Sequence, residues 1–566
     1  MCDIFKLPIE TIDNVQVLED NILSDLELEN TDTNNSMYNY LFNTTNDYGK
    51  KMIGRWNKVY TSNKDYLKDT SNMIKKYDNK TKSNVCESWD KIKNTSRFLE
   101  KYYYIEWEYL TFLNNYSVIH TVLSYYRLIS PFMTFLLPII LFLSSYFILR
   151  WNGLQMSFSE FYKMTMKVFW SNSIIGRFIT GFTNMDLKTQ AYSIFSIIMY
   201  ISQIYNNIMV IVRMNSNLRE MHSYIFEIKS YMKNTVKSMK KYIELIKDYS
   251  TYNSFKDILT DNCLKMENFI DIIKDIPDDH NTLNEIVYIG YVQKIIYSIY
   301  VDKELDDIMN YSFGFNGYID NLNGVKHNIE LKYISYAEFN NKDTQFKDAY
   351  YPPLLATSDK DKIVKNTYNL DKEIMITGPN AAGKTTLIKT TLFNIICSQQ
   401  LGVGFYKKAN IHIYDKLFCY LNIPDTSGRD SLFQAEARRC VDIINRLNSC
   451  NNNIRTFCIF DELYSGTNHY EAIASAYSFL NYLIKNYNFH FMMTTHFIDL
   501  CKKLSKNNKK IKNMKMFVKK HNDDFKYTYK IKKGISLIKG GVKVLKDLSY
   551  PEEIINDTRE FLEKEF

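Results

Sequence analysis

The chain has 566 residues, too many for a single hydrophobic core, so we expect roughly three or four structural units. Its 71 basic and 63 acidic residues leave a net charge of +8. An extended polyanion would need this modest excess on one face, so the total charge alone does not indicate nucleic-acid binding. The nine cysteines are scattered without a CxxC pair, which gives no indication of a zinc or redox site and predicts reduced thiols in an intracellular compartment. The first thirty residues lack an apolar core followed by a cleavage site, so we expect no secretory signal.

The N-terminal region, from about residue 13 to 94, is polar with scattered aromatic residues. Segments such as Tyr48 to Tyr66 place apolar residues at helical spacing. This pattern predicts several short helices.

An uncharged run of 22 residues follows, from Leu128 to Leu149, bounded by Arg127 and Arg150. As a helix it would be about 33 Å long, which is the thickness of a bilayer core. Its two prolines are tolerated better in a membrane helix than in a soluble one. The run therefore predicts a transmembrane segment, and the alternative is a helix buried inside a soluble dimer.

A second uncharged run of 24 residues extends from Thr189 to Val212. It contains four side-chain amides that are costly in lipid, so the sequence leaves open whether it crosses a membrane. The residues between the two runs argue against a simple hairpin with a cytosolic C-terminal domain, because five of them are basic: Arg150, Lys163, Lys167, Arg177 and Lys188. The segment Phe158 to Trp170 can instead lie along the membrane interface as an amphipathic helix.

The region from Arg213 to about Asp275 repeats apolar residues three and four positions apart, which predicts a long packed helix. After His280 another helical stretch leads to Leu331. Tyr333 to Phe339 alternates as a strand, and the remainder alternates apolar strands with helices. This C-terminal pattern is typical of an α/β nucleotide-binding domain.

A phosphate-binding loop lies between a predicted strand, Glu373 to Thr377, and an apolar helix. It has the GxxxxGK[ST] pattern in its required context. Glycines let backbone N–H groups turn toward phosphates, Lys384 reaches the β and γ phosphates, and the Thr385 hydroxyl is a ligand for Mg²⁺. The predicted ATP-binding residues are Gly378, Pro379, Asn380, Ala381, Ala382, Gly383, Lys384, Thr385 and Thr386.

Two further strands end in polar residues suited to hydrolysis. Phe457 to Phe460 leads into Asp461, which can hold Mg²⁺ through water, and Glu462, which can polarise the attacking water. Phe491 to Met493 leads into Thr494, Thr495 and His496, and His496 is a candidate sensor of the γ-phosphate. As an isolated residue this histidine would be structural.

The motifs together resemble the ATPase domain of the MutS mismatch-repair family. The resemblance rests on TGPNAAGKTTL, on Asp461 to Asn468, on Thr495 to Phe497, and on a C-terminal stretch from Tyr529 to Ile555. Residues 41–51 followed by Trp56 look like the start of that family's helical core. With this start included, the resemblance covers about two-thirds of the chain.

The resemblance implies a dimer in which each ATP is bound by one subunit and capped by a signature segment of the other. Here that segment should be Ser427 to Glu436, with Ser431 contacting the γ-phosphate in trans. The implied catalytic residues are Glu462, His496, Lys384 and Ser431, and the implied Mg²⁺ ligands are Thr385 and Asp461. The implied fold is an α/β ABC-type P-loop ATPase domain at the C-terminus plus an all-α MutS-like core and lever with an inserted membrane segment.

Several residues depart from the family pattern. Mismatch-detecting members carry a Phe-x-Glu wedge in an N-terminal domain, whereas this sequence begins almost directly at the helical core, and Glu160-Phe161-Tyr162 has the wrong order. Ile363 stands where the family often has an aromatic residue near adenine, and Ser465 stands where arginine is common. We therefore expect that mismatch recognition, base affinity and subunit coupling differ.

The expected organisation is an N-terminal part of the core (1–100), a membrane-associated insertion (101–212), a core and lever (213–345) and the ATPase domain (346–566). The expected function is a MutS-like, membrane-associated, Mg²⁺-dependent ATPase whose dimeric sites drive the lever. From the resemblance, its role is related to DNA mismatch repair or DNA handling, and its ATPase domain lies in an intracellular reducing compartment. The expected partners are a second copy, membrane lipid and, from the resemblance alone, double-stranded DNA. The alternatives are a transport-like machine without DNA binding and an ATP-switched membrane scaffold. Packing of residues 13–94 with the lever requires two membrane crossings or none, although the basic loop disfavours two.

Overall fold

The computed structural model describes residues 4–28, 36–78, 84–173, 176, 178–179, 186–277, 286–356, 363–421, 423, 431–449, 454–521, 524–538 and 540–565. The chain forms two compact units, each made of separate stretches of sequence. The first comprises Met1–Val85, Thr235–Leu264 and Asp307–Phe566, and the second comprises Cys86–Asn234 and Lys265–Asp306.

The first unit begins with a series of short elements. They are η1 (Pro8–Thr11), β1 (Val15–Val17), α1 (Asp20–Asp25), α2 (Met37–Phe42), α3 (Asp47–Trp56), β2 (Val59–Thr61) and α4 (Lys64–Lys76). Asn46 and Asn63 begin α3 and α4 by accepting hydrogen bonds from the first-turn N–H groups. The buried Trp56 indole donates to Asn321 at 3.1 Å, which ties α3 to α14 (Lys303–Glu330).

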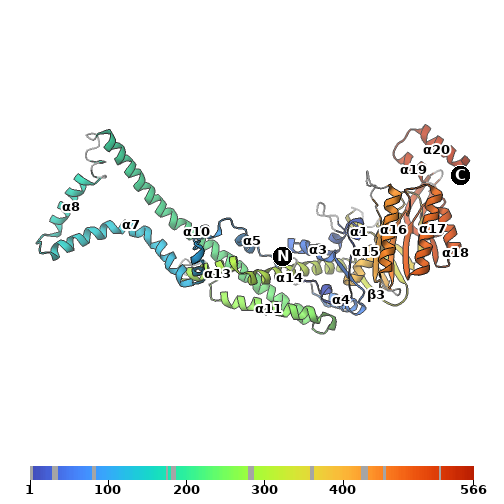
Figure 1. Ribbon diagram of the computed structural model, residues 1–566, viewed down its shortest axis with the longest axis horizontal. Coiled ribbons are helices and arrows are strands. Elements are labelled where there is room, and N and C mark those ends of the chain that lie inside the picture. The colour runs from blue at the N-terminus through green and yellow to red at the C-terminus, as the bar shows by residue number, and fades with distance from the viewer. Residues whose placement is uncertain are drawn as a thin grey trace. The chain divides into compact units, whose positions relative to one another are not determined.

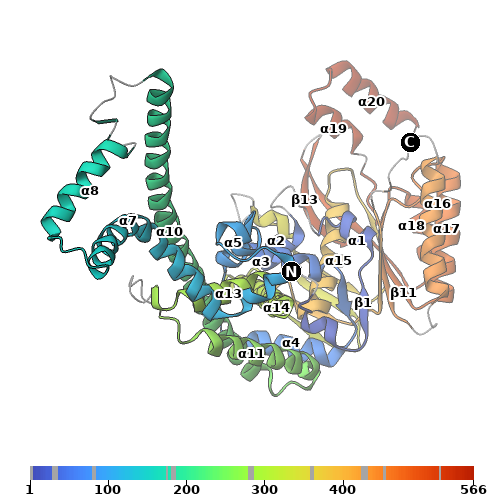
Figure 2. The same ribbon diagram turned by 60° about the vertical axis from the view of Figure 1, so that its left-hand side comes forward.

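A six-stranded sheet in the order β13-β12-β6-β11-β10-β9 forms the centre of the C-terminal part. Its strands are β6 (Glu373–Thr377), β9 (Lys416–Tyr420), β10 (Thr456–Asp461), β11 (Phe489–Thr494), β12 (Ile511–His521) and β13 (Asp524–Lys533). All neighbours are parallel except β12 and β13, which pair as an antiparallel hairpin. Figures 1 and 2 show α15 (Lys384–Leu401) on one face, and α16 (Leu432–Asn448), α17 (His469–Asn486) and α18 (Ile498–Asn507) on the other.

A smaller five-stranded sheet has the order β5-β4-β8-β3-β7. Its strands are β3 (Ser335–Phe339), β4 (Thr344–Ala349), β5 (Asn366–Leu370), β7 (Val403–Gly404) and β8 (Lys408–Ile411), and η5 (Pro352–Ala356) follows β4. Two helices, α19 (Gly541–Asp547) and α20 (Glu552–Glu565), follow β13.

The second unit is helical in its described residues. It contains α5 (Glu87–Lys93), α6 (Phe98–Lys101), η2 (Glu108–Asn115), α7 (Ser117–Trp151), α8 (Phe158–Asn172), α13 (Ile289–Val301) and parts of α10 (Leu187–Ile246) and α11 (Asn253–Ile273). Ser157 and Glu160 form a capping box that begins α8. Phe142 of α7 packs on Phe161 of α8 with 5.1 Å between ring centroids.

The first apolar run lies inside α7 and the second inside α10. By length and composition, one helix of the described residues, α10, qualifies as able to cross a membrane, and its qualifying stretch is not buried within the protein. Ile139–Trp151 of α7 is a shorter apolar helical segment. Many large apolar side chains of α7 are exposed, among them Leu136, Leu137 and Ile140.

The prediction of one long helix from Arg213 to Asp275 is wrong, because α10 ends at Ile246 and α11 begins at Asn253. The break falls on a polar segment, where η4 (Ser250–Tyr252) forms and the Thr251 hydroxyl donates to Asp69 at 2.8 Å. Residues such as Ser, Thr and Asn are unfavourable in a helix interior, which is consistent with a break here. Arg177, His280 and Ser427 to Asp430, which the sequence analysis used, lie outside the described residues.

Candidate nucleotide-binding site

The loop between β6 and α15 has the backbone geometry of an anion cradle. β6 is fully buried, and the loop emerges from its carboxyl end at Gly378. Gly383 has φ +88 and directly precedes α15, and Ala381 has φ 59, an uncommon conformation for a residue with a side chain. A Cβ on Gly378 would lie 3.0 Å from the Cβ of Met516, so this position has little room for a side chain. Because the first N–H groups of a helix have no partner within that helix, those of α15 can face an anion.

Lys384 is the first residue of α15, and its side chain is only 6% exposed. Its ammonium donates to the Gly378 carbonyl at 3.1 Å and lies 2.8 Å from His496 Nε2 and 3.7 Å from Glu462 Oε1. Burial lowers the pKa of Lys384, and the nearby carboxylates of Glu462 and Asp461 oppose that shift. The cation is thus desolvated but stabilised by these carboxylates.

Asp461, at the end of β10, is held by two threonine hydroxyls. Thr385 Oγ1 donates to Asp461 Oδ2 at 2.8 Å, and Thr494 Oγ1 donates to Asp461 Oδ1. Asp461 pairs with Thr494 in the β10–β11 register, so neighbouring parallel strands bring these groups to one sheet edge. Thr385 and Asp461 are thus adjacent, as expected for ligands of one cation.

Glu462 follows directly and takes a left-handed backbone with φ 50. Its N–H donates to the Thr494 carbonyl at 3.2 Å, which fixes this strained residue to β11. Its Oε1 lies 3.1 Å from His496 Nε2. The hydrogen bond with His496 lowers the pKa of Glu462, burial opposes it, and the charges of His496 and Lys384 lower it further. Glu462 is therefore ionised near neutral pH.

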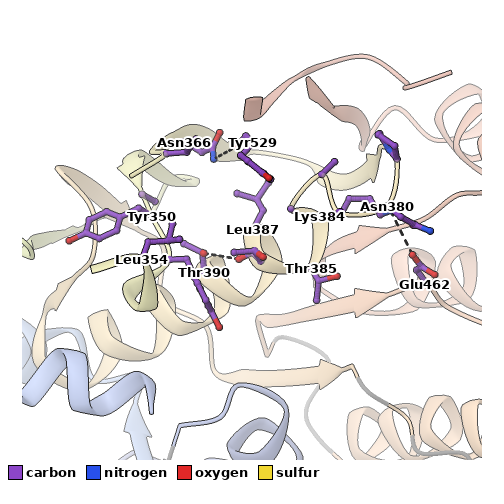
Figure 3. Close-up of a pocket in the computed structure, with 18 residues that line it drawn as sticks. Tyr350, Leu354, Asn366, Asn380, Lys384, Thr385, Leu387, Thr390, Glu462 and Tyr529 are labelled. Carbon is purple, nitrogen blue, oxygen red and sulfur yellow. Dashed lines mark hydrogen bonds and ion pairs between the residues drawn. The ribbon is translucent and has the colours of Figure 1, made fainter. Parts of the chain in front are cut away.

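A cavity of about 520 Å³ opens beside the phosphate loop (Figure 3). Its lining includes the loop from Pro379 to Thr386, together with Glu462 and with Tyr350, Leu354 and Tyr529. The volume is in the range of small-molecule sites. The aromatic part of this cavity was not predicted from the sequence.

Tyr529 is oriented by a local irregularity of the hairpin. It has φ 53 and lies where the register of β12 and β13 shifts. The Asn366 side-chain amide donates to the Tyr529 carbonyl at 3.0 Å and accepts from the Ile531 N–H at 2.9 Å (Figure 3). A bulge of this kind redirects a side chain, here into the cavity. Val364, and not Ile363, lines the cavity, just before β5 begins.

Ser431 is the residue immediately before α16 and forms a capping box with Gln434. It does not line the cavity of its own chain. Five residues along α16, the buried Glu436 accepts from the Ser465 N–H at 3.0 Å, from the Ser465 hydroxyl at 3.0 Å and from the Gly466 N–H at 3.1 Å. Ser465, noted in the sequence as an unusual residue, is thus bonded to the same helix that carries Ser431.

A mainly parallel sheet, a glycine loop leading into a helix, a lysine at the start of that helix, and two carboxylates and a threonine at the strand ends define a P-loop nucleotide-binding domain. The model of the family MutS domain V matches residues 374–565. The C-terminal part of this chain belongs to the MutS domain V family.

Individual proteins give the same relationship over a limited part of the chain. The DNA mismatch repair protein MutS of Prochlorococcus marinus (strain MIT 9312) is 30% identical over 192 residues, which is 33% of this chain and 20% of that protein. The protein of the same name from Clostridium botulinum (strain Alaska E43 / Type E3) is 31% identical over 242 residues, 42% of this chain and 25% of that protein. The alignments thus span about a quarter or less of these relatives.

Proposed function

We propose that the chain binds ATP with Mg²⁺ in the cavity beside Lys384 and hydrolyses it. The observation that carries this proposal is the convergence of Lys384, Glu462 and His496 within 3.7 Å of one another, next to the bonded pair Thr385 and Asp461. The charge and hydrogen-bonding capacity of this cluster suit a phosphate group and a water molecule held side by side.

The residues present fit Mg²⁺. The ion prefers hard oxygen ligands, and the Thr385 hydroxyl and the Asp461 carboxylate are such ligands at adjacent positions. When bound, Mg²⁺ would neutralise charge on the phosphate oxygens. The hydroxyl of Thr494 fixes the orientation of Asp461, as a hydrogen bond behind a metal ligand does.

His496 links phosphate binding to Glu462. Its Nε2 lies 2.8 Å from the Lys384 ammonium and 3.1 Å from Glu462 Oε1. One ring nitrogen cannot accept from Lys384 and donate to Glu462 at the same time. A γ-phosphate that attracts Lys384 leaves His496 free to donate to Glu462, which orients this carboxylate as the group that accepts a proton from water.

The base of the nucleotide would contact Tyr529. An exposed aromatic ring lines the cavity beside the phosphate loop, because a Cβ on Gly383 would lie 3.2 Å from the Tyr529 ring, and aromatic rings stack on purines. In this proposal Tyr529 replaces the aromatic residue that the family often has at the position of Ile363.

The complete site would be dimeric, with Ser431 of one copy completing the ATP site of another. The position of Ser431 at the start of α16, outside its own cavity, supports this arrangement. The nucleotide cycle would move the helical lever of residues 213–331.

The exposed apolar residues of α7 and the apolar stretch of α10 support membrane association. We also propose that the ATPase domain lies in an intracellular reducing compartment. Double-stranded DNA is proposed as a partner because relatives are DNA mismatch repair proteins by name. A membrane-coupled machine without DNA binding is the second candidate, favoured by the same exposed apolar helices.

The test is phosphate release by the full-length protein in detergent, with and without Mg²⁺ and duplex DNA. Glu462→Gln is the matched variant, because it keeps the size of the side chain and removes its basicity. We expect Mg²⁺-dependent hydrolysis that is lost in Glu462→Gln, while ATP binding remains. Equal turnover in the variant would refute the proposed catalytic role. Stimulation by DNA would support a nucleic-acid partner, and DNA-independent hydrolysis would favour the membrane-coupled machine.

A further inference from the structure

The positive charge of the chain is concentrated in one short segment. Residues 502–533 contain 13 lysines and two aspartates, a net charge of +11. The whole chain has a net charge of +8, so the rest, with 58 basic and 61 acidic residues, is slightly negative. The clustering of positive charge that binding of an extended polyanion requires is therefore present, although the net charge of the whole chain does not show it.

The structure places much of this charge on one face of the β12–β13 hairpin. In β12 the side chains of Met514, Met516 and Val518 are buried, so the alternate residues point to the opposite face. That opposite face carries Lys515, Phe517 and Lys519. The antiparallel register adds the residues directly across from them, which are Lys532, Lys530 and Lys526.

Two of these cross-strand pairs unite like charges, Lys515 with Lys532 and Lys519 with Lys526. Directly opposed like charges destabilise a sheet. The Lys532 ammonium lies 3.6 Å from the centre of the Phe517 ring, and this cation–π contact partly offsets the repulsion between the lysines. Ion pairs of this region involve other lysines, such as Lys512 with Asp371 at 2.9 Å, and none of the described carboxylates pairs with these four lysines.

We propose that this face, the basic hairpin face of Lys515, Lys519, Lys526 and Lys532 around Phe517, binds the phosphate backbone of a nucleic acid duplex. A bound polyanion relieves the repulsion that the free hairpin retains. Beyond Lys515, where β12 no longer pairs with β6, the hairpin is a two-stranded ribbon, and such a ribbon has dimensions that fit the major groove. The inference is independent of ATP hydrolysis, because none of these five residues lines the nucleotide cavity.

The same charge could attract an anionic membrane, but the hairpin lacks the second feature of a membrane-binding surface. Interfacial segments combine basic residues with exposed large apolar side chains that enter the lipid. Among the described residues of 502–533, the one large apolar side chain that is highly exposed is Tyr529, which lines the nucleotide cavity. The exposed apolar surface lies instead on α7, α8 and α10. The charge pattern of the hairpin thus favours a hydrated phosphate backbone.

The experiment measures binding of a fluorescent DNA duplex to the full-length protein in detergent over a series of salt concentrations. Lys515→Gln with Lys532→Gln should lower the slope of log affinity against log salt by about 1.8, and should weaken binding by roughly 60-fold at 0.1 M salt. The control, Lys342→Gln with Lys347→Gln, removes two exposed lysines outside the segment and should change neither value. Unchanged ATP affinity shows that each variant is folded.

A second variant, Lys532→Glu, places a carboxylate opposite Lys515. It should raise the melting temperature and still weaken duplex binding, a combination that a merely structural role of these lysines does not produce. An unchanged salt slope in the double glutamine variant, or no duplex binding by the unaltered protein, would overturn the proposal. If the double glutamine variant no longer binds phosphatidylserine vesicles but binds the duplex as before, the proposal is also overturned and the face is assigned to lipid.

Discussion

Replacing Glu436 by alanine should slow ATP hydrolysis although this residue does not line the nucleotide cavity. Glu436 is 2% exposed and accepts three hydrogen bonds from Ser465 and Gly466, which follow Glu462 by three and four residues. Tyr464, which lies between Glu462 and Ser465, has φ 60, so this segment has a second left-handed residue besides Glu462. Such a backbone persists only where its surroundings fix it.

The magnitude follows from the groups left without a partner. Each donor that loses a charged acceptor costs about 1–3 kcal/mol when it remains buried. Ser465 is exposed, so water can replace the carboxylate there. We therefore expect the free energy of unfolding to fall by about 3 kcal/mol, which is less than the sum over all three donors. A shift of Glu462 by about 1 Å would lower kcat by roughly 100-fold.

The assay compares kcat, ATP affinity and melting temperature of Glu436→Ala and Glu436→Gln with a nearby control, Glu471→Gln. Glu471 is an exposed acid of α17 that accepts from Thr467 at 2.7 Å. We expect a large fall in kcat for alanine, a smaller fall for glutamine, little change in ATP affinity, and no effect of the control. If Glu436→Ala lowers the melting temperature but hydrolyses ATP as fast as the unaltered protein, the carboxylate anchors α16 without positioning Glu462.

Thr494→Val removes one of the two hydroxyls that hold Asp461 and should weaken Mg²⁺ affinity by about 10- to 100-fold, measured from the Mg²⁺ dependence of hydrolysis. Tyr529→Ala should weaken ATP binding by about tenfold in a fluorescent-nucleotide titration, whereas Tyr529→Phe should bind normally, because stacking contributes about 1 kcal/mol. Burial, with the nearby charges of Arg455 and Lys510, lowers the pKa of His490 to about 4. The unfolded chain therefore takes up this proton first, so up to about 3 kcal/mol of stability is lost as the pH falls from about 6.5 to 4. His490→Gln should reduce the pH dependence of the free energy of unfolding in this range, measured by denaturant unfolding at a series of pH values. Burial raises the pKa of Glu373, and its opposing contribution should remain in the variant.

The phosphate loop could be predicted because its chemistry is local in sequence. An apolar strand, a glycine turn and a helix are consecutive, and the structure has β6 at the predicted residues, Glu373–Thr377. Asp461 likewise follows a strand whose apolar run marks it as buried. Parallel strands of one sheet then bring their carboxyl ends together, so adjacency of Asp461, Glu462 and His496 follows from strand order.

Tyr529 could not be placed in this way, because it lies in an alternating strand where every second residue is a candidate for either face. Its orientation depends on a shift in hairpin register and on Asn366, which is 163 positions away in sequence. Periodicity carries no information about such a contact. The end of α10 at Ile246 is similar, since the apolar spacing continues beyond it and only the polar segment around Thr251 marks the break.

The basic hairpin face was visible in the sequence in part. A count over residues 502–533 reveals the excess of lysine, but not which lysines share a face. The register supplies that, because it sets Lys515 opposite Lys532 and Lys519 opposite Lys526. The sequence thus shows the local excess of lysine, whereas the pairing of the two strands shows which lysines form one binding face.

The helix α16 connects the two halves of the proposed composite site. Its first turn begins at Ser431, which would contact the nucleotide of another copy, and Glu436 bonds the loop that follows its own Glu462. A Cβ on Gly466 would lie 2.7 Å from Leu432 Cγ, so this loop also packs directly on the first turn of α16. We therefore expect that a displacement of Ser431 is transmitted to Gly466, and through the left-handed Tyr464 to Glu462. If two copies share ATP sites through this helix as proposed, we predict that their hydrolysis is coupled.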